Sequence, residues 1–407
     1  MTGQLAFVES PVQLLNVLEW AHTRAAATGT PSAARAGAPT GAPGRADAAP
    51  TTASGPATVG GSAARALRPT DATAPGAAQA APDLTVVVLS PTDPMSRGQL
   101  RRMAQLARDE GLTVRWQEAR GGRGALVRTL RQLAPPLRSA ERVIIGDPFS
   151  RYVQLLLTLF GPRHLTVVDD GTATMEFAAQ LSRGERLVRW HRKGSLGPRE
   201  LVLAPVTSLA RRRLAPSRGR TVEIFTSLPV EAPEGVTVTE NSFAWTRSRF
   251  GPPLLTGGAD LVGTSLVETG VVDAEHYDRV VAELARAHGA TRYFAHRRES
   301  AEKLHRIAVE TGLQVVRPDL PLELIARRGP IGRTVVSFPS TVVHTLPLAL
   351  AGTGVRVAVC EIAPEWLRES ASPRAQGFLS GVAGTAAHEV DRLTTRAANG
   401  TDRLEFG

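Results

Sequence analysis

The sequence predicts an α/β protein of two domains, each built on a parallel sheet covered by helices. The chain has 407 residues, which is enough for two domains with separate cores. Short apolar segments typical of buried strands alternate with helical patterns along most of the chain. Polar residues directly follow several of these segments, at the strand ends where open α/β sheets bind ligands.

The N-terminal half begins with a strand over 5–8, and a helix follows because Ser10 suits the N-cap and Pro11 the first helical position. Residues 25–81 are mainly Ala, Gly, Pro, Thr and Ser, which predicts a disordered surface insertion. The alternation then continues with predicted strands at 84–89, 112–116, 142–146 and 164–168, and predicted helices at 95–110, 124–133 and 151–160.

The C-terminal half repeats this alternation. The segment 229–253 contains scattered Pro and Gly and predicts an irregular connection, so we expect domains at 1–228 and 254–407. Strands are predicted at 259–263, 292–295, 313–316, 333–338 and 355–359, and helices at 274–287, 301–311, 321–327, 342–351 and 385–398.

Composition favours a cytoplasmic protein. Hydrophobic residues make up 42% of the chain, and no segment approaches the roughly eighteen unbroken apolar residues of a membrane-spanning helix. The N-terminus lacks the basic and apolar regions of a secretory signal. Cys360 is the single cysteine, so it forms no intramolecular disulfide and no cysteine-based metal site, and we expect it in the core.

Basic charge is concentrated in one segment. The formal net charge is +10, and Arg183–Arg220 contains eleven basic and two acidic residues. One interpretation is contact with a polyanion, which could be nucleic acid, anionic lipid headgroups or acidic polysaccharide. Of these we favour acidic polysaccharide or the anionic inner face of a membrane. The other interpretation is a solvated surface in a chain biased toward arginine. We expect no nucleic-acid partner.

Asp169-Asp170-Gly171 follows a predicted apolar strand. One of the two carboxylates could accept a proton from an attacking hydroxyl, and Gly171 would allow a sharp turn close to a substrate. Two adjacent acids also tend to differ in pKa. The alternative is structural, with Asp170 capping the helix that begins near Ala173.

Two further groups follow strands in the C-terminal half. His296 and Arg297 suit a phosphate, because an imidazole and a guanidinium both donate hydrogen bonds to its oxygens. Ser340 and Thr341 precede a helix, where hydroxyl and backbone N–H groups bind anions. An ordinary surface loop and simple helix capping are the respective alternatives.

The order of these motifs resembles the bacterial polysialyltransferase and lipooligosaccharide sialyltransferase families. The opening Phe7-Val8-Glu9-Ser10-Pro11-Val12-Gln13 is similar to the opening of those enzymes, and Asp169-Asp170-Gly171 resembles their acidic-acidic-Gly motif. His296 lies where their His-Pro motif falls, Ser340-Thr341 resembles their Ser-Ser/Thr motif, and the run from Leu261 to Glu268 resembles a further family segment. Arg297 replaces the proline of the His-Pro motif.

The resemblance implies a GT-B-like enzyme, with two Rossmann-like domains whose parallel sheets face a central cleft. It implies an inverting, metal-independent glycosyltransferase without a cofactor, which moves a sugar, sialic acid, from a CMP-sugar to a glycan hydroxyl. Asp169 would be the general base, and Asp170 is the alternative for that role. His296 would be a general acid or electrostatic stabiliser, and Ser340, Thr341 and Arg297 would hold the donor phosphate. Ser10, Pro11, Gln13, Gly171 and Glu268 would belong to the cleft and its loops.

Two other functions are compatible with the same sequence features. The same fold could use another nucleotide sugar, such as CMP-Kdo or a UDP-sugar, or the chain could be a non-catalytic two-lobed protein that binds polyanions. No P-loop, His-Glu-x-x-His or cysteine cluster is present, so the sequence predicts neither a P-loop nor a zinc site. His344 and Arg151 are minor candidates for the cleft, and ordinary core and surface roles are favoured for them.

Overall fold

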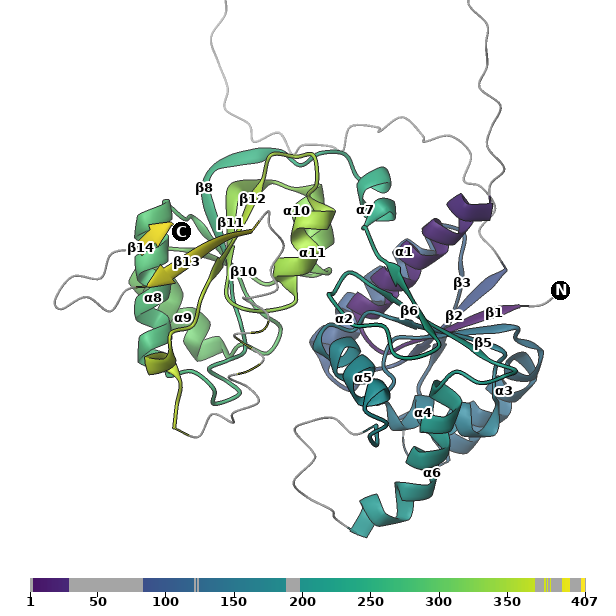
Figure 1. The fold of residues 1–407 in the computed structure, drawn as a ribbon. Helices are drawn as coiled ribbons and strands as arrows, with labels where there is room; N and C mark the ends of the chain where they lie inside the picture. The colour runs from purple at the N-terminus through teal and green to yellow at the C-terminus, as the bar shows by residue number, and fades with distance from the viewer. Residues whose placement is uncertain are drawn as a thin grey trace, which may run out of the picture.

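The molecule has two lobes, which lie side by side in Figure 1. This computed structural model describes residues 3–28, 83–120, 122, 124–187, 198–369, 377, 379, 381, 390–395 and 404–406. Each lobe contains a seven-stranded sheet, and the two sheets have the same kind of strand order. Of the helices in these ranges, none is both long enough and apolar enough to span a membrane.

The N-terminal lobe is a doubly wound parallel sheet in the order β3-β2-β1-β4-β5-β6-β7. The chain starts in the middle of the sheet, builds outward to one edge, and then returns to build the other edge. The strands are β1 (Gln4–Val8), β2 (Leu84–Leu89), β3 (Thr113–Gln117), β4 (Arg142–Ile145), β5 (His164–Val168), β6 (Thr221–Thr226) and β7 (Val236–Glu240). The helices are α1 (Pro11–Thr28), α2 (Pro94–Asp109), α3 (Ala125–Ser139), α4 (Arg151–Leu159), α5 (Thr172–Ser182) and α6 (Pro198–Leu214).

The C-terminal lobe repeats this topology in the order β10-β9-β8-β11-β12-β13-β14, with an antiparallel β13–β14 pair at one edge. Its strands are β8 (Leu255–Val262), β9 (Arg292–Phe294), β10 (Gln314–Val316), β11 (Ile331–Ser337), β12 (Arg356–Cys360), β13 (Val390–Thr395) and β14 (Leu404–Phe406). Its helices are α8 (Ala274–His288), α9 (Ala301–Thr311), α10 (Leu322–Arg328), α11 (Val342–Ala349) and the 3₁₀ turn η2 (Pro364–Trp366). The predicted fold class, two Rossmann-like domains of the GT-B type, is therefore confirmed.

Each sheet is buried on both faces, which explains why its strands are continuous apolar runs rather than alternating ones. Along β1, Ala6 and Val8 pack into the core on the α1 and α2 face, and Leu5 and Phe7 pack into the core on the opposite face. The second sheet has the same two-sided burial, with separate cores on its two faces. Cys360 is fully buried in one of them, as expected.

Three sequence-based expectations about elements are wrong. Helix α1 continues to Thr28, so residues 25–28 are helical, and the rest of the predicted insertion lies outside the described residues. The segment 229–253 is not irregular, because it contains β7 and α7 (Ala244–Arg249). Residues 390–395, within the helix expected at 385–398, form strand β13, because they pair with β12 on one side and β14 on the other.

Helix α7 connects the two lobes. The buried Glu19 of α1 accepts hydrogen bonds from the backbone N–H groups of Trp245 (2.8 Å) and Thr246 (2.9 Å). Arg247 of α7 donates to the carbonyl of Leu348 in the C-terminal lobe at 2.9 Å. The crossing segment is therefore held by both lobes, and this helps to set the spacing of the cleft between them.

Candidate functional site

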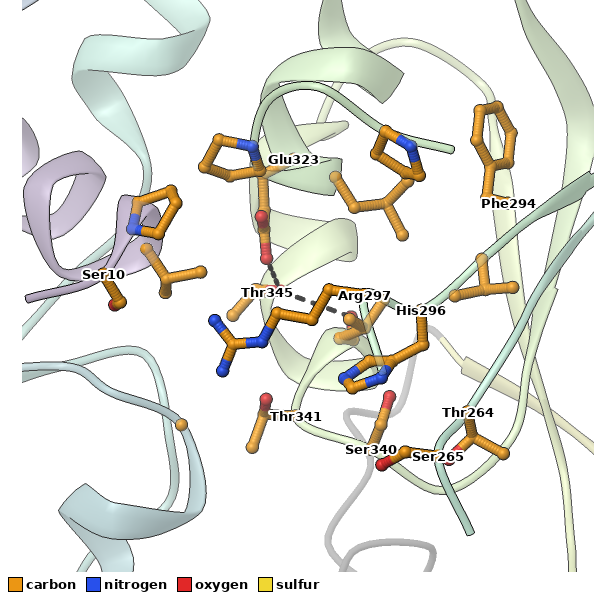
Figure 2. A pocket seen from close by; sticks show the side chains of 18 of the residues that line it. Ser10, Thr264, Ser265, Phe294, His296, Arg297, Glu323, Ser340, Thr341 and Thr345 are labelled. Carbon is orange, nitrogen blue, oxygen red and sulfur yellow. Dashed lines mark hydrogen bonds between the residues drawn. The ribbon is translucent and has the colours of Figure 1, made fainter. Parts of the chain in front are cut away.

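A cavity of about 410 Å³ lies between the lobes, at the carboxyl ends of the strands of both sheets. The N-terminal lobe contributes residues that follow β1, β5 and β6, and the C-terminal lobe contributes residues that follow β8, β9, β10 and β11. The predicted site residues that line it are Ser10, Pro11, Asp169, Asp170, Gly171, His296, Arg297, Ser340 and Thr341. Figure 2 shows the C-terminal wall with Ser10 on the opposite side.

Asp169 is held firmly within the N-terminal lobe. Its two carboxylate oxygens accept hydrogen bonds from Thr226 Oγ1 (2.8 Å) and from the N–H (2.9 Å) and Oγ (3.1 Å) of Ser227. Burial raises the pKa of Asp169, and these hydrogen bonds oppose that rise. The Asp169 carboxylate therefore already accepts hydrogen bonds from the last residue of β6 and from the residue after it.

Asp170 lies in a more open position at the same strand end. Its side chain is half-buried and lines the cavity, and its Oδ1 accepts a hydrogen bond from Ser10 Oγ at 3.3 Å. Ser10 Oγ also accepts the N–H of Gln13 at 3.2 Å, so the start of α1 positions the hydroxyl that contacts Asp170. The predicted helix start at Ser10-Pro11 thus places a polar group directly beside the acid.

Gly171 turns the chain toward the opposite lobe with φ +66° and ψ −131°, a conformation that side chains rarely adopt. A Cβ atom at this position would lie 3.2 Å from Thr341 Oγ1. The loop at 169–171 and the loop at 340–341 therefore approach each other closely across the cleft, and Gly171 permits that approach.

His296 lies half-buried on the opposite wall, with its backbone N–H donating to Glu299 at 2.6 Å. Burial, followed by the charges of Arg297, Arg298 and Lys303, lowers the pKa of His296 to about 4. The N–H of Arg298 donates to His296 Nδ1 at 3.2 Å, which assigns the ring proton to Nε2. At neutral pH the ring is therefore a neutral hydrogen-bond donor through Nε2.

Ser340 and Thr341 lie between β11 and α11 and line the cavity. Thr341 is the N-cap residue of α11, but its side chain makes no capping hydrogen bond. Ser340 Oγ lies 3.5 Å from Ser337 Oγ, at the outer limit of a hydrogen bond. The capping alternative does not account for these hydroxyls, and they are placed to donate to an anion in the cavity.

The remaining predicted residues divide into two groups. Arg297 is exposed, and Figure 2 shows its side chain extending into the cavity from the loop that holds His296. Gln13, Glu268, Arg151 and His344 do not line the cavity. Gln13 is buried, and its Oε1 accepts the N–H of Glu9 at 2.7 Å, whereas Glu268 accepts the N–H of Ser300 at 3.1 Å.

Glu323, which was not among the candidate residues, lines the C-terminal wall together with Thr345. Thr345 Oγ1 donates to Glu323 Oε1 at 2.5 Å, and burial raises the pKa of this carboxyl (Figure 2). The available signal was an acid in the first turn of the predicted helix at 321–327, just beyond the strand at 313–316. Arg317 also lines the cavity and was not among the candidates, whereas Thr264 and Ser265 line it from the run between Leu261 and Glu268.

The cavity thus combines an acid on one wall with an imidazole, hydroxyls and guanidiniums on the other. Such a pair of walls suits proton removal from one bound group and stabilisation of an anion on another. Within the described ranges, no group of three or more His, Cys, Asp or Glu side chains is arranged to hold a metal ion.

Comparisons with known proteins give weak likenesses. No family model and no curated protein sequence matches the chain. An alpha/beta-galactoside alpha-2,3-sialyltransferase from Photobacterium phosphoreum aligns over 96% of this chain and 98% of its own, with 8% identity and a TM-score of 0.45. Os79 from O. sativa, in complex with UDP, aligns over 77% and 80%, with 12% identity and a TM-score of 0.33. MurG from Acinetobacter baumannii aligns over 76% and 78%, with 12% identity and a TM-score of 0.32.

Proposed function

We propose that the chain is an inverting, metal-independent glycosyltransferase that transfers sialic acid from a CMP-sugar to a glycan hydroxyl. The observation that carries this proposal is the cavity between the lobes, which Asp170 lines from one lobe and His296, Ser340 and Thr341 line from the other. The CMP donor is favoured by the ordered motifs at positions 10–13, 169–171, 296 and 340–341, which resemble those of bacterial sialyltransferases.

Asp170 is the proposed general base, in place of the Asp169 favoured by the sequence. It is the more open of the two acids, and Ser10 positions its carboxylate. In the proposed reaction the acceptor hydroxyl oxygen attacks the anomeric carbon while Asp170 takes the hydroxyl proton. The bond between that carbon and the donor phosphate oxygen breaks, and CMP leaves with the electron pair. Attack opposite the leaving group inverts the configuration.

The C-terminal wall is proposed to stabilise the departing CMP. The His296 ring is neutral before the donor binds, and its Nε2–H donates a hydrogen bond to a phosphate oxygen. Its proposed role is therefore electrostatic stabilisation of the phosphate, not transfer of a proton from an imidazolium. Ser340 and Thr341 donate further hydrogen bonds, and Arg297 supplies positive charge. The buried Glu323 suits the ribose hydroxyls, because carboxylates commonly accept hydrogen bonds from a nucleotide diol.

The basic segment is proposed to dock on an anionic membrane surface. Among its described residues, Arg211, Arg212 and Arg213 lie at the end of α6, and Arg220 lies just before β6. This end of β6 is opposite the carboxyl end that borders the cavity, which supports a role for the basic segment in docking rather than in binding the reacting sugar. Vesicles containing anionic lipid should bind the protein in a salt-sensitive way, and binding of acidic polysaccharide alone would overturn this assignment.

The catalytic proposal predicts turnover of CMP-sialic acid in the presence of a glycan acceptor, measured as released CMP. Asp170→Asn should lower kcat by at least about 100-fold, because it removes the proton acceptor without changing the size of the side chain. Thermal unfolding should be little changed, because Asp170 is half-buried.

The matched control is Asp169→Asn. It should lower the free energy of unfolding by about 1–3 kcal/mol, because the buried donors of Thr226 and Ser227 lose a charged acceptor. It should retain more kcat than Asp170→Asn. Equal turnover in the wild type and Asp170→Asn would sink the assignment of the base, and release of UDP from a UDP-sugar would overturn the donor.

A further inference from the structure

Lysine is almost absent from this chain. Only Lys193 and Lys303 occur among 48 basic residues, and all the others are arginine. Lys303 is also 1% exposed, whereas lysine is almost never fully buried unless its charge is paired. A buried lysine in a chain that uses arginine almost everywhere else indicates a position that a guanidinium cannot occupy with the same contacts.

The surroundings of Lys303 explain this choice. Its Nζ lies 2.7 Å from Glu299 Oε1, donates to the carbonyl oxygen of Thr264 at 3.1 Å, and lies 3.8 Å from Glu268 Oε2. The same nitrogen lies 3.8 Å from the centroid of the Tyr277 ring. An ammonium is a compact charge that can donate in several directions, whereas a guanidinium is a larger planar group with a fixed fork of donors.

The three oxygen partners belong to loops that build the C-terminal wall of the cavity. Thr264 lies in the loop after β8 and lines the cavity directly. Glu299 lies in the loop after β9, and its Oε2 accepts the backbone N–H of His296 at 2.6 Å. Glu268 accepts the N–H of Ser300 at 3.1 Å, which ties the first loop to the second.

The network beneath these loops is tightly packed. Tyr293 donates its hydroxyl proton to Glu299 Oε1 at 2.6 Å, and the hydroxyl oxygens of Tyr293 and Tyr277 lie 2.7 Å apart. A Cβ atom on Gly263 would lie 2.3 Å from Glu299 Oε2, so the backbone before Thr264 rests directly against the network. The loops therefore cannot shift independently of Lys303 and Glu299.

We infer that Lys303 is a positioning residue. Its buried ammonium fixes the loops after β8 and β9 relative to each other and so orients His296 toward the donor phosphate. Its effect on nucleotide binding rests on the proposed function. Its effect on the position and titration of His296 does not. Lys303 does not line the cavity, so it acts through Glu299 and Thr264 and not by contact with substrate.

The test compares Lys303→Met, Lys303→Arg and Glu299→Gln with the wild type, well below their unfolding temperatures. Lys303→Met keeps the length of the side chain without its charge and should weaken CMP binding roughly tenfold by calorimetry. Lys303→Arg should not restore affinity, because the planar group does not fit. Glu299→Gln keeps an acceptor for the N–H of His296 and should give a smaller loss, and it serves if the lysine variants do not fold.

The second readout is the NMR titration of His296 without nucleotide. In Lys303→Met the pKa of His296 should move upward from about 4, because a nearby positive charge is lost. The matched control is Asp260→Asn, which breaks a buried ion pair with Arg292 (2.6 Å) in the same sheet away from the cavity. It should lower stability and leave both CMP affinity and the His296 titration unchanged.

The outcomes separate the two proposals. If Lys303→Met loses stability but keeps wild-type CMP affinity and the wild-type His296 titration, Lys303 is merely structural and the inference is overturned. If the wild type binds no CMP while the His296 titration still shifts in Lys303→Met, the coupling between Lys303 and His296 stands and the CMP donor falls.

Discussion

Asp169 and Asp170 are adjacent in the sequence, yet their surroundings differ sharply. Asp169 is buried and accepts three hydrogen bonds from the turn after β6, whereas Asp170 is half-buried and faces the cavity. A carboxylate that already satisfies buried donors is poorly placed to take a substrate proton, and removing it would leave those donors unsatisfied. These contacts support the proposed division of roles, in which Asp170 is the general base and Asp169 is a structural acceptor.

The lowered pKa of His296 links the stability of the protein to pH. Because its pKa falls to about 4 from an ordinary 6.5, the folded protein binds fewer protons than the unfolded chain between these values. The stability linked to this group is therefore fully present above pH 6.5 and is lost as the pH falls toward 4. NMR titration of the ring should show a midpoint near pH 4 without nucleotide and a higher midpoint with CMP bound, because phosphate favours the imidazolium. A midpoint at 6.5 without nucleotide would contradict the burial and charge described for this ring.

At the scale of elements, the close approach of two loops depends on Gly171. Gly171→Ala should lower turnover substantially, because it adds backbone strain of about 1–3 kcal/mol and places a methyl group 3.2 Å from Thr341 Oγ1. Gly111→Ala is the control, since Gly111 also has a positive φ (+83°) but open space around its Cβ position. Both variants should lose stability in thermal unfolding, and only Gly171→Ala should lose activity. Equal turnover in the two variants would show that the approach to Thr341 is unimportant.

Most central strands could be predicted because each is a continuous apolar run buried on both faces, as in β1, β2 and β5. The edge strand β7 and the next-to-edge strand β13 carry more polar residues, and their strand state depends on pairing with β6 and with β12 and β14. The facing of Asp170 and His296 follows from the rule that ligands bind at the carboxyl ends of strands. The hydrogen bonds of Asp169 could not be predicted, because Thr226 lies 57 residues further along the chain.

At the scale of the whole molecule, the two lobes are held together around the cavity by a few polar contacts. Gln99 of α2 donates to the carbonyl of Pro318 at 2.6 Å, and Arg102 lies 3.1 Å from Asp319. Both members of the second pair are more than half exposed, and exposed ion pairs contribute little. Helix α7, anchored by Glu19, is the more strongly buried connection, so changes in lobe spacing are expected to pivot near it.

Calorimetric titration of CMP and UDP into the intact protein shows whether the cavity binds the proposed donor nucleotide. We expect one CMP site per chain, weaker binding of UDP, and a roughly tenfold loss of CMP affinity in His296→Ala, because the ring donates to the phosphate. The cavity between the lobes would then be a nucleotide-binding site whose C-terminal wall contacts the phosphate. Absence of binding by either nucleotide, or CMP binding that His296→Ala and Ser340→Ala leave unchanged, would contradict the account.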